Sequence, residues 1–221
     1  MKQKQYILFD LDGTITDPGL GITNSIMHAL RRLGIAVPER EELYRFIGPP
    51  LWDSFQKYYG ISKEESNVAV EYFREYYRDR GIYECKVYEG MRELLETLKA
   101  EGRTLIVATS KAEFFARQVL GHFGLAAYFD FIAGSELDGT RSEKAEVIAY
   151  ALENCGITDK SRAVMIGDRE HDIIGAKKNG IESIGVLHGY GSREELEAAG
   201  AGYIADNIIK LAELLIGEND V

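Results

Sequence analysis

The chain has 221 residues, and 45% of them are hydrophobic, which is enough to bury one substantial core and to carry an inserted subdomain. A formal net charge of −10 argues against a nucleic-acid partner, because affinity for a phosphate backbone depends on a basic face. An excess of carboxylates suits a hard divalent cation instead.

The N-terminal segment and the two cysteines bear on the protein's location and on its thiol chemistry. The basic N-terminal segment MKQKQ precedes an apolar run of only four residues, which is too short for a signal-peptide core or a membrane span. We therefore expect a cytoplasmic protein without a membrane partner. Cys85 and Cys155 form no C-x-x-C pattern and no cluster with the four histidines, so we expect buried reduced thiols and neither zinc nor a disulfide framework.

The first predicted strand, residues 6–9, ends in the motif FDLDGT at 9–14. In an open parallel sheet, ligands bind outside the carboxyl ends of the strands, so Asp10 and Asp12 are placed for function. Gly13 permits a sharp turn and Thr14 offers a hydroxyl group. Taken alone, the motif fits an ordinary polar turn equally well.

Residues 16–86 carry helix signals only. Asp17 reads as an N-cap before Pro18 at the first helical position, residues 39–47 and 51–59 are short amphipathic candidates, and Ser62 with Glu65 forms a capping box ahead of a longer helix. This segment is nearly neutral, with ten Lys or Arg against eleven Asp or Glu. It is predicted to be an all-helical insertion.

Two features of the insertion allow a functional and a structural interpretation. The aromatic group Tyr72, Phe73, Tyr76 and Tyr77 recurs at helical spacing, which favours core packing over a stacking platform. The rigid turn at residues 48–50 either presents backbone to a ligand or connects two helices.

From residue 87 the pattern changes to alternation. Helices are predicted at 90–101, 112–123, 143–155 and 170–179, and strands at 103–108, 129–133, 162–166 and 183–187. Such alternation predicts an α/β fold with a doubly wound parallel sheet. We expect residues 1–15 and 87–221 to form this core and 16–86 to be inserted after its first strand.

Three further strand ends or helix starts carry candidate site residues. Thr109 and Ser110 follow the strand at 103–108, where they could bind a phosphate group or simply cap the next helix. Lys144 opens the helix at 143, where the helix dipole disfavours a cation, so it is either paired with an anion or a solvated lysine. Asp168 follows the strand at 162–166, and Asp172 lies four residues later on the next helix.

These acids suit phosphoryl transfer. A carboxylate beside a divalent cation, here Asp10, is a workable nucleophile toward phosphorus, because the cation offsets repulsion between the anions. Asp12 can serve as general acid and then as general base. Asp168 can reach a cation beside Asp10, while Asp172 can orient water or Asp168. Oxygen ligands favour magnesium over zinc, and we leave His171 out of the site.

The ordered set of motifs resembles the haloacid dehalogenase superfamily over essentially the whole chain. The resemblance implies Asp10 as nucleophile, Asp12 as acid/base, and Thr109 and Lys144 as phosphate-binding residues. It implies Mg²⁺ held by Asp10, the backbone carbonyl of Asp12, and Asp168. The Asp at position 12 is similar to the phosphatase branch, and the helical insertion is similar to the family's first cap type, which closes over the substrate.

The subfamily is indicated by FDLDGTITDPGLGITNSI, IGPPL and GVLHGYGSREEL, which look like proteins named phosphoglycolate phosphatase or 5′-nucleotidase. Phosphoglycolate-type members continue their lysine motif as K-P-x-P, whereas Ala145 follows Lys144 here. That departure weakens phosphoglycolate as the substrate.

The sequence therefore predicts a magnesium-dependent phosphatase that hydrolyses a small soluble phosphomonoester through an aspartyl-phosphate on Asp10. A phosphosugar mutase, which would return the phosphoryl group to substrate, is the enzymatic alternative. A receiver-like signalling module is disfavoured by the helical insertion and by the second Asp two residues on. A non-catalytic phosphate-binding regulatory protein is disfavoured by the complete set of site residues. The oligomeric state and the cap residues that read the leaving group are not predicted.

Overall fold

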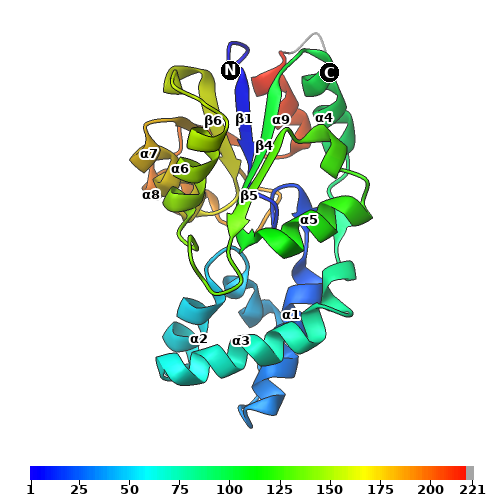
Figure 1. The fold of residues 1–221 in the computed structure, drawn as a ribbon, viewed down its shortest axis with the longest axis vertical. Helices are drawn as coiled ribbons and strands as arrows, with labels where there is room; N and C mark the ends of the chain where they lie inside the picture. Colours follow the sequence, from blue (N-terminus) through cyan, green and yellow to red (C-terminus); the bar gives the residue numbers. More distant parts are fainter. Residues whose placement is uncertain (218–221) are drawn as a thin grey trace. The chain divides into compact units, whose positions relative to one another are not determined.

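The computed structural model describes residues 1–217 and divides the chain into two compact units. Unit 1 comprises Met1–Asp17 together with the chain from Val87 onward, and unit 2 comprises Pro18–Lys86. Figure 1 shows unit 1 as a sheet covered by helices and unit 2 as helices alone. Each unit is described by itself below.

Unit 1 is built on a parallel sheet, which within the described residues has six strands in the order β5-β4-β1-β6-β7-β8. The strands are β1 (Tyr6–Phe9), β4 (Thr104–Ala112), β5 (Phe131–Ser135), β6 (Ala163–Gly167), β7 (Glu182–Val186) and β8 (Tyr203–Ala205). The predicted α/β class with a parallel sheet is confirmed. The first strand lies at the centre, between β4 and β6, so its carboxyl end is flanked by theirs.

Helices cover both faces of this sheet (Figure 1). The helices of unit 1 are α4 (Met91–Ala100), α5 (Glu113–His122), α6 (Lys144–Asn154), α7 (Glu170–Asn179), α8 (Arg193–Ala199) and α9 (Ile208–Leu215). On one face α6 and α7 pack around Leu8, Ile106 and Met165. Because the central strands are buried on both faces, they read as continuous apolar runs without alternation.

Unit 2 contains α1 (Gly19–Arg32), α2 (Leu51–Tyr59) and α3 (Lys63–Tyr77), with the short 3₁₀ segments η1 (Arg40–Phe46) and η2 (Gly81–Tyr83). Helix α3 packs against both α1 and α2. The capping box of Ser62 and Glu65 at the start of α3 is confirmed. Of the aromatic group on α3, Phe73 and Tyr77 are buried and stack on each other, in agreement with core packing.

Several local predictions were wrong. Asp17 does not cap α1: it lies in the two-residue strand β2 (Thr16–Asp17), which pairs with β3 (Lys86–Val87), and its carboxylate accepts a hydrogen bond from the Tyr190 hydroxyl. The N-cap residue is Pro18, which makes no side-chain cap bond. Residues 40–46 form a 3₁₀ segment and not an α-helix.

Two other expectations concern helix starts and thiols. Neither Thr109 nor Ser110 is the N-cap residue of α5. Strand β4 continues to Ala112, and the helix begins only at Glu113. Cys85 and Cys155 are not joined in a disulfide, and both are half-buried, whereas the sequence predicts buried thiols. Among residues 1–217, no helix combines the length and apolar character that a membrane crossing requires.

Candidate active site

The site is positioned by the carboxyl ends of β1, β4 and β6. The register places Phe9 beside Val107 on one side and Ile166 on the other, so the residues that follow each strand converge. The Asp10 N–H continues the ladder by donating to the Ile166 carbonyl at 2.9 Å. The side chain of Asp10 therefore starts from a fixed backbone, although it lies just beyond the strand.

Lys144 binds two buried acids. Its Nζ lies 2.8 Å from Oδ1 of Asp10 and 2.8 Å from Oδ1 of Asp172, and it donates to the Ala108 carbonyl at 3.2 Å. Burial lowers the pKa of Lys144, but the two neighbouring carboxylates raise it further, so that its pKa lies above the ordinary lysine value. The ammonium group is thus held charged inside the protein, and Lys144 is paired with anions and not solvated.

Asp10, Asp168 and Asp172 form a cluster of buried carboxylates whose nearest ligand atoms all lie within 4.8 Å of one another. Burial, then Asp172 and Asp10, raise the pKa of Asp168 well above its ordinary value. Burial also raises the pKa of Asp172 to about 6, against the opposing effect of Lys144. The Lys144 ammonium group contacts only two of these three acids, Asp10 and Asp172, and the remaining excess of carboxylate oxygens fits a divalent cation.

The backbone approaches these acids very closely. Gly13 has φ +87°, and a Cβ there would overlap the Asp168 carboxylate. A Cβ at Gly167 would overlap Asp172 in the same way. The Tyr190 N–H donates to Oδ2 of Asp168 at 2.8 Å, which fixes that carboxylate from a third loop. These glycines are required because no side chain fits between the loops and the acids.

Asp12 is held by a residue to which the sequence assigned no role. Nζ of Lys111 lies 2.7 Å from Oδ2 of Asp12, and both side chains are largely buried. Oδ1 of Asp12 is buried and accepts no hydrogen bond from residues 1–217. Lys111 directly follows Thr109 and Ser110, and this adjacency to two candidate site residues is the signal that could have drawn attention to it.

Thr109 and Ser110 lie between Ala108 and Ala112, where the pairing of β4 with β5 shifts register. Thr109 is buried, and its Oγ1 accepts from the Lys111 N–H at 3.2 Å. Ser110 is half-buried, and its carbonyl accepts from Oγ of Ser135 at 2.9 Å. Both residues lie within β4, whereas the sequence predicts that they follow the strand, and their phosphate-binding role stays a prediction.

A second group that sequence reasoning missed supports the loop after β1. Nε2 of His188 donates to the Thr14 carbonyl at 3.0 Å, and Oγ1 of Thr14 lies 3.4 Å from Oδ1 of Asp168. The Tyr88 ring packs edge-on against His188 with 4.5 Å between ring centroids. Burial lowers the pKa of His188, which favours its neutral form. The only sequence feature that could have drawn attention to His188 is its position within the segment GVLHGYG.

Comparison with known proteins identifies the family. A family model described as haloacid dehalogenase-like hydrolase matches residues 7–186, which include the clustered acids, Asp12, Lys111 and Lys144, while His188 and Tyr190 lie just beyond the match. The chain belongs to the haloacid dehalogenase-like hydrolases. The predicted resemblance is therefore confirmed.

Named relatives narrow the kind of enzyme. A 5′-nucleotidase from Pseudomonas aeruginosa is 46% identical over 209 residues, covering 95% of this chain and 94% of that protein. The tyrosine-protein kinase PtkA of Mycobacterium tuberculosis is 41% identical over 87% of this chain, and the chain spans only 65% of that relative. The crystal structure of a predicted phosphatase from Clostridium acetobutylicum matches with a TM-score of 0.93 at 49% identity, covering 96% of this chain and 97% of that one. The hydrolase family and its phosphatase-named members identify an enzyme of the phosphatase type.

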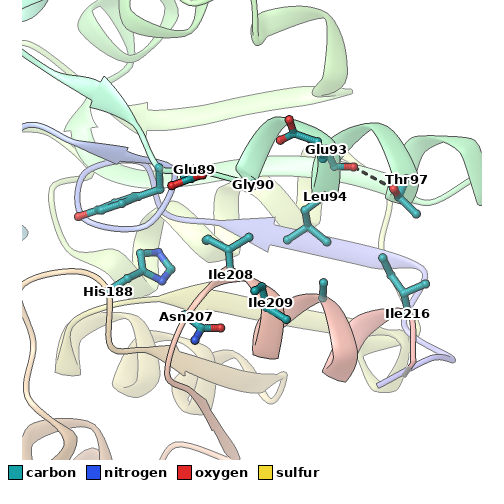
Figure 2. Close-up of a pocket in the computed structure, with 12 residues that line it drawn as sticks. Glu89, Gly90, Glu93, Leu94, Thr97, His188, Asn207, Ile208, Ile209 and Ile216 are labelled. Atoms are coloured by element: carbon teal, nitrogen blue, oxygen red, sulfur yellow. Dashed lines mark hydrogen bonds between the residues drawn. The ribbon is translucent and has the colours of Figure 1, made fainter. Parts of the chain in front are cut away.

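A cavity of about 700 Å³ lies elsewhere in unit 1, between α4 and α9. Figure 2 shows Leu94, Ile208 and Ile209 among its lining, with His188 at one end. None of the clustered acids lines this cavity.

Proposed function

We propose that the chain is a Mg²⁺-dependent phosphomonoester hydrolase that forms a transient aspartyl-phosphate on Asp10. The observation that carries this proposal is the environment of that carboxylate. Both the Leu11 N–H, at 2.7 Å, and Lys144, at 2.8 Å, bind Oδ1 of Asp10. Oδ2 is thereby left as the oxygen that can attack phosphorus, with its orientation set by the two contacts on Oδ1.

The metal would be held by Asp10, Asp168 and, by family resemblance, the backbone carbonyl of Asp12. When bound, it supplies positive charge that offsets the repulsion between Asp10 and an anionic substrate. Asp172 is less suited as a ligand, because one of its oxygens faces Lys144 and the other accepts from the Arg169 N–H at 3.1 Å. We assign Asp172 to the orientation of Lys144.

The reaction follows from these positions. Oδ2 of Asp10 attacks phosphorus, the bond from phosphorus to the ester oxygen breaks, and that oxygen takes a proton from Asp12. Asp12, now ionised, takes a proton from water as the water oxygen attacks the same phosphorus. The bond between phosphorus and Asp10 then breaks and inorganic phosphate leaves. Lys144, Thr109 and Ser110 bind the phosphoryl oxygens, and most of the rate gain comes from such positioning and charge stabilisation.

We propose a small phosphomonoester as substrate, with nucleoside 5′-monophosphates as the first class to test, because the 46% identical relative is named 5′-nucleotidase. Phosphoglycolate is a weaker candidate, since Ala145 follows Lys144. The helical unit 2 would select among substrates as a cap, as the family resemblance implies.

The test is release of inorganic phosphate from a panel of nucleoside monophosphates, phosphoglycolate, sugar phosphates and pyrophosphate, with and without Mg²⁺. Asp10→Asn should abolish release, whereas Asp79→Asn, an exposed acid of unit 2, should leave it unchanged. Transfer of the phosphoryl group back to a sugar phosphate without phosphate release would favour the mutase. No turnover of any substrate by the parent protein would overturn the proposal.

A further inference from the structure

The ion pair between Lys111 and Asp12 has no part in the reaction scheme above, although Asp12 is the acid/base group of that scheme. The two charged atoms lie 2.7 Å apart, and the side chains of Lys111 and Asp12 are 8% and 11% exposed. Exposed ion pairs hold side chains weakly, but a pair this buried fixes the orientation of both partners. We infer that Lys111 is a positioning residue that aims the Asp12 carboxyl group at the leaving-group oxygen. This inference rests on the proposed function.

The two oxygens of Asp12 are unequal. Lys111 binds Oδ2, while Oδ1 is buried and has no hydrogen-bond partner among residues 1–217. Buried polar atoms are nearly always paired in proteins, so an unpaired carboxylate oxygen needs an explanation. The explanation is that the partner of Oδ1 is the substrate. Oδ1 is the oxygen that gives a proton to the leaving group and later accepts one from water.

The backbone of Lys111 is itself fixed. The register of β4 against β5 shifts between Ala108 and Ala112, and bulges of this kind re-aim side chains beside active sites. On the β5 side, a Cβ at Gly134 would lie 2.6 Å from the Lys111 carbonyl oxygen, so the two strands are in close backbone contact. The Ser135 hydroxyl also donates to the Ser110 carbonyl at 2.9 Å. Lys111 therefore reaches Asp12 from a rigid segment, as a positioning group must.

This role predicts a dependence on the leaving group. An alkyl phosphate, such as a nucleoside 5′-monophosphate, expels an alkoxide that must be protonated. 4-Nitrophenyl phosphate expels a stable phenolate that leaves without a proton. A misdirected Asp12 therefore slows the first reaction and spares the second. A lysine that only bound the phosphoryl group would affect both substrates equally.

The experiment measures kcat/KM of Lys111→Met and the parent enzyme on both substrates. This quantity covers the steps up to loss of the leaving group, so it is unaffected by later hydrolysis of the phosphoenzyme. We expect a fall of about 10²-fold for the alkyl phosphate and less than about 5-fold for 4-nitrophenyl phosphate, because general acid catalysis contributes about 10²–10⁴-fold. Lys111→Arg should recover part of the loss, since it keeps a cationic donor.

The control is Lys99→Met, which removes the lysine of a 2.9 Å ion pair with Asp130 on the surface of unit 1. It should change neither rate. Retained turnover of 4-nitrophenyl phosphate by Lys111→Met shows that the site is folded. If that variant is inactive on both substrates, or loses the same factor on both, and Lys111→Arg behaves in the same way, the inference is wrong. An inactive parent enzyme would instead overturn the proposed function and this inference together.

Discussion

Substitution of Lys144 should lower both the free energy of unfolding and the activity strongly, because its ammonium group lies between Asp10 and Asp172 and its side chain is only 3% exposed. Lys144→Met would leave two buried carboxylates without their cation. We expect the free energy of unfolding to fall by about 3–5 kcal/mol and activity to fall by at least about 10²-fold. Chemical denaturation and phosphate release measure the two effects.

The matched comparison for stability is again Lys99→Met, whose ion pair with Asp130 is partly exposed and should contribute only about 0–1 kcal/mol. Equal stability losses in the two variants would show that the interior pair of Lys144 has no special role.

The raised pKa values of Asp168 and Asp172 predict an unusual pH dependence. For Asp172 the pKa rises from 3.8 to about 6 on folding, so the folded chain binds the proton more tightly than the unfolded chain. Between these values the free energy of unfolding should fall as pH rises, by about 3 kcal/mol for this group. Lys144 stays charged throughout, since its pKa is raised above the ordinary lysine value.

A divalent cation reverses this trend, because it stabilises the ionised carboxylates. Mg²⁺ should therefore raise the melting temperature more at about pH 7.5 than at about pH 5, where protons compete for the same oxygens. Thermal denaturation with Mg²⁺ or with a chelator measures this. A Mg²⁺ effect that is equal at both pH values, or absent, would contradict the assignment of Asp10 and Asp168 to a metal.

Residues that end predicted strands were the ones that sequence reasoning could place. Asp10 and Asp168 each follow an apolar run, and parallel strands bring such positions to one edge of the sheet. Lys111 could not be placed in this way, because its direction depends on the register shift in β4. His188 was missed because its role is a hydrogen bond to the backbone of Thr14, which no spacing in the sequence indicates.

At the level of elements, the loop after β1 needs a glycine at position 13 to leave space for the Asp168 side chain. Gly13 has φ +87°, and a Cβ would overlap the Asp168 carboxylate. Gly13→Ala should therefore displace Asp168 and abolish the stabilisation by Mg²⁺, in addition to the cost of a left-handed conformation, about 1 kcal/mol. Calorimetric titration with Mg²⁺ and thermal denaturation check this.

Gly156→Ala is the matched control, because Gly156 has φ +62° with no atom within 4 Å of the added Cβ. It should carry the backbone cost alone and bind Mg²⁺ as the parent does. If Gly13→Ala also kept full Mg²⁺ binding, close packing against Asp168 would not be what requires the glycine.

Element boundaries were predicted less well than element types, for physical reasons. The strand at 103–108 continues to Ala112 because pairing with β5 extends it after a bulge. Asp17 looked like a helix cap, but its carboxylate binds the Tyr190 hydroxyl, a partner 173 residues away. Where local propensity and a distant partner compete, only the structure resolves the choice.

At the scale of the whole molecule, the division of labour between the two units is a prediction. If unit 2 selects the substrate, an exposed residue there should change specificity without changing the metal site. Arg45, whose guanidinium lies 4.1 Å from the Tyr58 ring centroid, is the candidate. Arg45→Ala should alter the ratio of kcat/KM between a nucleoside 5′-monophosphate and phosphoglycolate by about 10-fold or more.

The same variant should keep the Mg²⁺-dependent rise in melting temperature. Circular dichroism would verify that unit 2 stays helical after loss of the contact with Tyr58. An unchanged specificity ratio in a folded variant would remove Arg45 from the substrate-reading surface.

The central claim is that Asp10 carries the phosphoryl group during turnover. The most direct measurement is rapid acid quenching of the enzyme during turnover of its best substrate, followed by peptide mass spectrometry. The account predicts one added phosphoryl group on the peptide that contains Asp10, removable by hydroxylamine and missing from Asp10→Asn. A phosphoryl group on any other residue, or continued turnover by Asp10→Asn, would contradict it.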